Sequence, residues 1–175
     1  MPETGVAYCL ERVGLAKPDW KTLVVEGSGT SKATAADLWA VWSDLEHWPN
    51  WSPIHRSVAP VDANTLSIGG SFDQELGLGF PVGVQHERAT FDEFQPAAQV
   101  SWSGDKNGIR SCHRWQFQPT PDGGTRIHNV EIFVGTTMGL IKPLVGRRWN
   151  RLFQRAVDGL IAATTGAAEG SPRGR

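Results

Sequence analysis

The chain has 175 residues, of which 39% are apolar and 20% charged, and this fits one folded domain with its own core. Its formal net charge is −1, from 17 Lys and Arg against 18 Asp and Glu, so no overall basic field favours nucleic acid or an acidic membrane. Eight tryptophans against one tyrosine predict a wide apolar interior, a stacking surface for a ligand, or both.

The two cysteines, Cys9 and Cys112, show neither CxxC spacing nor a disulfide framework, so we interpret them as reduced thiols. No run of 18 apolar residues occurs, and we expect no membrane-spanning helix. The first 15 residues lack the basic and apolar regions of an export signal. These features predict a cytoplasmic protein.

The chain divides into three predicted parts. Residues 1–20 are expected to form an N-terminal appendage, and 21–165 a folded domain. Residues 166–175, which are small, polar and rich in Gly and Pro, predict a disordered tail.

The predicted domain begins with a strand over 22–30, where residues are β-branched and partly alternating. Thr34 and Asp37 then show the capping pattern that starts a helix. Pro49 breaks that helix early and leaves a Trp-rich connection over 45–54.

Further strand-like segments follow, separated by turn signals, as in an antiparallel sheet. They cover 56–60, 65–76, 82–94, 99–103, 109–118 and 125–135. Pro143 is expected to open a long terminal helix that Gly166 caps. Four arginines between positions 147 and 155 flank its apolar stripe, and we interpret them as a solvated face rather than a phosphate site. This order predicts an α+β fold in which a curved sheet wraps one helix around a cavity.

Two parts of the sequence resemble the SRPBCC superfamily, which includes START-like lipid carriers, birch-pollen-allergen-like proteins and polyketide cyclases. Residues 35–51 are similar to its N-terminal signature and read A-x-x-L-W-x-x-W-S-D-x-x-x-W-P-x-W. Residues 113–135 resemble its late hairpin and contain H-x-W-x-F-x-P, G-G-T-R and N-x-E-x-F-x-G in that order.

The resemblance covers about residues 22–165 and implies a helix-grip fold. In that fold a seven-stranded antiparallel sheet, with two short helices after its first strand, grips the C-terminal helix around a deep apolar pocket. It implies hydrophobic small-molecule ligands but no single reaction, because members carry lipids, cyclise polyketides, condense amines with aldehydes or bind hormones. The competing nuclear-transport-factor-like cone begins with helices and ends with strands, the reverse of this chain.

The Pro121–Gly124 turn allows the register of the late hairpin to be predicted. Residues two apart on a strand share a face, and the aromatic members indicate that this face is the inner one. A slip by one residue would turn all of these side chains outward. The expected cross-strand pairs are Phe117 with Ile127, Trp115 with Asn129 and His113 with Glu131, and Phe133 shares their face.

His113 and Glu131 are the candidate catalytic residues. A carboxylate beside an imidazole orients it and favours its charged form, which suits proton transfer near neutral pH. Enolisation and aldol-type closure of a polyketide need such a group. The alternative is a buried polar network, with Asn129, that braces the hairpin.

Arg88 is a candidate anchor for a ligand carboxylate or phenolate. The alternative is a solvent-exposed arginine, because neither face of the 82–94 strand is clearly apolar. The other expected ligand contacts are Trp42, Trp102, Trp115, Phe117, Asn129 and Phe133.

Five histidines occur without a metal-ligand spacing, so we expect no metal and no redox cofactor. The glycine-rich segment 77–81 lacks the ending of a phosphate-binding loop, and we interpret it as a mobile loop at a pocket mouth.

The sequence therefore predicts a polyketide-cyclase-like enzyme that binds a bulky hydrophobic molecule, aromatic or polyketide-derived. It would catalyse cyclisation or dehydration without a cofactor. A non-catalytic carrier or sensor of a hydrophobic molecule or lipid is the alternative, and a partner-binding module using the tryptophans of 39–51 is a third. We expect a monomer or homodimer, with no nucleic-acid or membrane partner.

Overall fold

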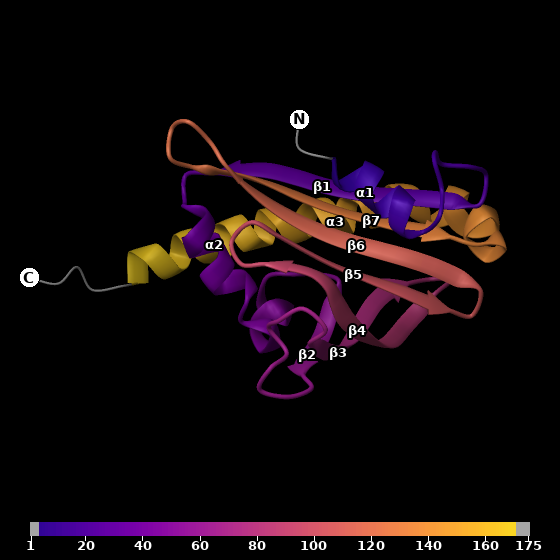
Figure 1. The fold of residues 1–175 in the computed structure, drawn as a ribbon, viewed down its shortest axis with the longest axis horizontal. Helices are drawn as coiled ribbons and strands as arrows, with labels where there is room; N and C mark the ends of the chain where they lie inside the picture. The colour runs from indigo at the N-terminus through magenta and orange to yellow at the C-terminus, as the bar shows by residue number, and fades with distance from the viewer. Residues whose placement is uncertain (1–3, 171–175) are drawn as a thin grey trace, which may run out of the picture.

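The protein is described here by a computed structural model that covers residues 4–170. Its sheet has seven strands in the order β1-β7-β6-β5-β4-β3-β2, and all neighbouring strands are antiparallel. The strands are β1 Thr22–Ser31, β2 His55–Pro60, β3 Ser71–Gly79, β4 Gly83–Gln95, β5 Gln99–Lys106, β6 Ile109–Pro119 and β7 Thr125–Val134. The helices are α1 Gly5–Arg12, α2 Ala35–Trp42, the 3-10 helix η1 Leu45–Asn50 and α3 Thr136–Gly170. This confirms the predicted helix-grip fold, with α3 lying along the curved sheet (Figure 1).

The hairpin of β6 and β7 has the predicted register. Phe117 pairs with Ile127, Trp115 with Asn129, and His113 with Glu131. Their side chains face α3, where the Phe153 ring lies 5.3 Å from the His113 imidazole. The turn chemistry and the inward aromatic residues were sufficient to predict both register and face.

Helix α3 differs from the prediction at both ends. It begins at Thr136 rather than Pro143, because the buried Met138 anchors its first turns and this packing outweighs the backbone bond that an internal proline removes. It continues through Gly166 to Gly170, so the predicted cap and the start of the predicted tail are helical. Residues 171–175 lie outside the described part of the chain.

The third predicted strand also begins later than expected. Residues 65–70 form a loop, and β3 starts at Ser71. The Thr65 hydroxyl accepts hydrogen bonds from the backbone N–H groups of Val61 and Asp62 and donates to the Ser71 carbonyl. These side-chain bonds hold a turn where the sequence pattern suggested extended chain.

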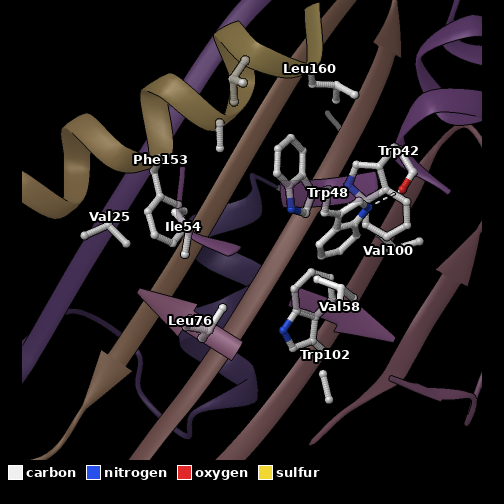
Figure 2. Close-up of a cluster of buried hydrophobic side chains, with 14 of the residues drawn as sticks. Val25, Trp42, Trp48, Ile54, Val58, Leu76, Val100, Trp102, Phe153 and Leu160 are labelled. Atoms are coloured by element: carbon white, nitrogen blue, oxygen red, sulfur yellow. Dashed lines mark hydrogen bonds between the residues drawn. The ribbon is translucent and has the colours of Figure 1, made fainter. Parts of the chain in front are cut away.

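A core of packed aromatic rings fills one end of the inner face. The Trp42 ring of α2 lies 4.9 Å from Trp48 of η1 and 6.5 Å from Trp102 of β5. Figure 2 shows these three rings gathered beside the sheet, with Phe153 and Leu160 of α3 in the same cluster. The tryptophans therefore build a solid interior at this end.

The prediction that both cysteines are reduced is wrong, because Cys9 and Cys112 form a disulfide. Helix α1 of the N-terminal appendage packs on the outer face of β6 and β7, which brings the two Cα atoms to 5.3 Å across 103 residues of sequence. A second apolar cluster, separate from the main core, surrounds the bridge. Sequence spacing alone does not reveal such a long-range contact.

No helix within residues 4–170 is long and apolar enough to cross a lipid bilayer.

Reduction of the bridge is expected to lower the free energy of unfolding by about 2–5 kcal/mol, because the bond closes a long loop in the unfolded chain. Urea unfolding with and without a reductant measures this difference. The double variant Cys9→Ser/Cys112→Ser is the control and should be insensitive to reductant. Equal stability of the oxidised and reduced wild-type protein would contradict a stabilising bridge.

Candidate active site

A pocket of about 390 Å³ opens between the sheet and the N-terminal half of α3. This volume lies in the usual range for small-molecule sites. Its apolar walls are formed by Leu78, Val82, Ile109, Phe133, Met138 and Trp149, and its polar groups include Gln85, Glu87, Lys106 and Ser111. The glycine-rich segment 77–81, which we interpreted as a loop at a pocket mouth, is largely the end of strand β3, and its Leu78 lines the pocket.

Strand β4 presents Gln85 and Glu87 to this pocket. Side chains alternate along the strand, and Ala89 and Phe91, on the same face as Glu87, are buried. This alternation places Arg88 on the outer face, where it makes two hydrogen bonds of 2.7 and 2.8 Å to Asp73. Arg88 borders the pocket only through the backbone of β4. The guanidinium group of Arg88 is exposed and paired with Asp73, which agrees with the alternative interpretation of a solvent-exposed arginine.

His113 and Glu131 lie beyond the inner end of the pocket. Ser111 and Phe133 line the pocket on β6 and β7, and His113 and Glu131 follow two residues further along the same inner face, about 7 Å deeper. Glu131 Oε2 is 3.3 Å from His113 Nδ1, and both side chains are largely buried, at 14% and 7% exposure. Glu87, in the pocket wall, is a third ionisable side chain whose charge acts on Glu131.

Burial sets the protonation of these groups. It raises the pKa of Glu131 well above 4.5, and the negative charge of Glu87 adds to this effect. Burial also raises the pKa of Glu87, with Lys106 acting against it. The pKa of His113 is lowered to about 4 by burial. We expected the carboxylate to favour a charged imidazole, but desolvation of both groups outweighs their attraction.

The hydrogen bonds of His113 agree with this protonation. Asn129 Oδ1, 2.6 Å away, accepts the N–H of His113 Nε2, so the lone pair of a neutral imidazole is on Nδ1, facing Glu131. An ionised carboxylate would repel that lone pair, whereas a protonated carboxyl group would not. Burial and this contact therefore both favour a protonated Glu131 carboxyl group beside a neutral His113 imidazole.

The polar network extends from Glu87 into the core, and sequence reasoning missed this part. Gln74 of β3 is buried and its Nε2 lies 3.5 Å from Glu87 Oε2. His55, whose pKa burial lowers to about 3, binds the Ser52 hydroxyl at 2.7 Å through Nδ1. Gln74 lies on the same buried face of β3 as Phe72 and Leu76, and this spacing of two residues was the available signal.

The remaining predicted ligand contacts divide between the pocket and the core. Phe133 lines the pocket, and Asn129 holds His113 at its inner end. The other four, which we expected to line a cavity, pack among the aromatic rings of the core instead and are not part of the pocket wall. They are Trp42, Trp102, Trp115 and Phe117.

No group of three His, Cys, Asp or Glu side chains within the described residues is arranged to hold a metal ion.

Comparison with known proteins places this geometry in a family. Residues 22–165 match the family described as "Polyketide cyclase / dehydrase and lipid transport". With the helix-grip fold, this match shows that the protein is a member of the SRPBCC superfamily. Within that superfamily, the chain belongs to the polyketide cyclase/dehydrase and lipid transport family. No curated protein sequence matches it.

Solved structures of low sequence identity share the fold. The Zhui aromatase/cyclase of Streptomyces sp. R1128 is 12% identical with a TM-score of 0.68, over 86% of this chain and 98% of that one. A norcoclaurine synthase mutant of Thalictrum flavum is 16% identical with a TM-score of 0.63, over 84% and 96%. Ara h 8.0201 is 15% identical with a TM-score of 0.61, over 83% and 99%.

The buried state of His113 predicts that it stays neutral in mildly acidic solution. Its imidazole ¹⁵N shifts should not change between pH 7.5 and about 5.5. Exposed His47, whose pKa the Asp44 carboxylate raises, should titrate over this range and is the internal control. Titration of His113 at or above pH 6.5 would contradict its burial as a neutral group.

The lowered pKa of His113 also makes the stability of the folded protein depend on pH. The folded-state pKa of His113 lies below the unfolded value of 6.5, so its contribution to stability is present above pH 6.5 and is lost as the pH falls toward 4.

Proposed function

We propose that this protein is a cofactor-independent cyclase or dehydratase that acts on a bulky hydrophobic molecule, aromatic or polyketide-derived. The observation that carries this proposal is the buried contact of Glu131 with His113, just beyond the inner end of a pocket with apolar walls. A carboxyl group whose pKa is raised by burial is suited to donate and recover a proton near neutral pH.

An aldol-type closure illustrates the chemistry that the two carboxyl groups support. Glu87, as the carboxylate, removes a proton from the carbon beside a ketone, while the Glu131–His113 pair donates its proton to the carbonyl oxygen. The enol carbon then attacks a second carbonyl of the same molecule. Glu87 returns its proton to the new alkoxide, and the enol oxygen returns the other to the pair, so both groups are restored. The pair and Glu87 also suit loss of water, in which one removes a proton and the other protonates the departing hydroxyl.

The pocket walls contribute by positioning. Phe133, Met138 and Trp149 present apolar surface on which a flexible chain can be held folded with its reacting carbons together. The aromatase/cyclase and norcoclaurine synthase that share the fold support an aromatic substrate class.

A carrier of the same ligands is the second candidate function. One observation favours it: His113 is engaged by Asn129 and Glu131 at its two ring nitrogens, as in a structural network that braces the hairpin. The following experiment separates the two functions.

β-Tetralone, a bicyclic aromatic ketone, is the probe, and NMR follows the exchange of the protons beside its carbonyl for deuterium. We expect the protein to accelerate exchange over buffer, and Glu131→Gln to lower the acceleration about a hundredfold by removing the proposed general acid. Glu75→Gln, which alters a carboxylate on the outer face of β3, is the matched control and should behave as wild type.

Quenching of tryptophan fluorescence by the ketone reports binding, since Trp149 lines the pocket. Binding without faster exchange would identify a carrier and contradict the catalytic proposal. Absence of both binding and exchange would contradict the proposed substrate class.

A further inference from the structure

Four large apolar side chains are exposed on the elements that form the rim of the pocket. Trp20 is 56% exposed, Phe80 83%, and Leu140 and Leu144 70% each. We refer to these four residues as the rim patch. Exposed apolar side chains of this size in one region mark an interaction surface.

Leu140 and Leu144 belong to α3, and the other two members of the rim patch, Trp20 and Phe80, are held beside that helix. A Cβ atom at Gly139 would lie 2.6 Å from the Trp20 ring, so this ring covers the helix just before Leu140. On the other side, Arg148 donates to the carbonyls of Phe80 and Leu78, which fixes the turn after β3 beside the helix. Leu144 is one helical turn before Arg148.

The rim patch also adjoins the pocket. Phe80 lies between Leu78 and Val82 in the chain, and Leu140 is two residues after Met138; Leu78, Val82 and Met138 all line the pocket. A surface that bound the rim patch would therefore meet the pocket at its mouth.

The charge around the rim patch is basic. Residues 136–157 of α3 contain five cations and no acidic residue: Lys142, Arg147, Arg148, Arg151 and Arg155. Exposed Arg147 and Arg151 continue the face of Leu140 and Leu144 at helical spacing. Lys21 Nζ lies 5.4 Å from the Trp20 ring. The acidic groups on this side include Asp19 next to Trp20, and Glu87 and Asp105 in the pocket wall. The whole-chain charge of −1 led us to expect no membrane partner, but it does not describe this face.

We propose that the rim patch docks on the surface of a membrane containing anionic lipids, with the pocket mouth turned toward the bilayer. Leucine, phenylalanine and tryptophan side chains beside a row of arginines match the two layers of such a surface, acyl chains and phosphate groups. A second copy of the chain fits less well. A two-fold interface on this face would bring the arginines of both copies together without acidic partners. This docking stands whether the pocket is catalytic or a carrier site.

Co-sedimentation of the full chain with vesicles tests the docking. We expect binding to vesicles of phosphatidylglycerol mixed with phosphatidylcholine, and binding about tenfold weaker to phosphatidylcholine alone. The double variant Leu140→Gln/Leu144→Gln should lose about tenfold in affinity for the mixed vesicles, because the inserted apolar groups are gone. Arg147→Gln/Arg151→Gln should remove most of the preference for anionic lipid.

Two variants serve as matched controls. Ile68→Gln removes an apolar side chain of similar exposure, 72%, from the loop before β3, and Arg126→Gln removes an exposed cation from β7. Both should bind vesicles as wild type does. Failure of the wild-type chain to bind anionic vesicles at low salt would overturn the proposal, as would equal losses in the Leu140/Leu144 and Ile68 variants. A dimer that the Leu140/Leu144 variant dissociates would identify the patch as a subunit interface instead.

Discussion

The packing of Trp42 and Trp48 against the inner face of the sheet determines where this protein has a pocket. The curved sheet presents a wide apolar face, and α3 covers only part of it. The two tryptophans, carried by α2 and η1, fill the remaining space at one end and meet Trp102 of β5. The interior is therefore closed there, and open volume is left beside the N-terminal half of α3.

The polar groups of the interior follow from this division. His113 lies where the aromatic core meets the pocket, with the Trp102 ring 4.4 Å away on one side and Glu131 on the other. Desolvation by the core lowers the pKa of His113 and raises that of Glu131, which favours a protonated Glu131 carboxyl group beside a neutral imidazole. Glu87 connects that pair to the pocket wall. Catalysis and carriage both depend on the same pocket, but only catalysis depends on this proton.

Much of the fold was predictable, because the relevant signals are local. The turn at 121–124 and the aromatic residues at alternate positions of β6 defined the register that brings His113 opposite Glu131. Long-range contacts were not predictable in this way. The bridge from Cys9 to Cys112 depends on where α1 docks, and the start of α3 depends on the packing of Met138. The adjacency of Glu131 and His113 was predicted correctly, but the expected charged imidazole was wrong. The depth of burial decides the charge of these groups, and the alternation of residues along a strand does not predict that depth.

The most direct test of this account is the titration of Glu131 by NMR of its side-chain carboxyl carbon, assigned by comparison with Glu131→Gln. The account predicts a midpoint well above 4.5, and a lower midpoint in Glu87→Gln, where the neighbouring negative charge is removed. A midpoint near 4.5 in the wild-type protein, unchanged by Glu87→Gln, would contradict the raised pKa of Glu131 on which the proposed chemistry depends.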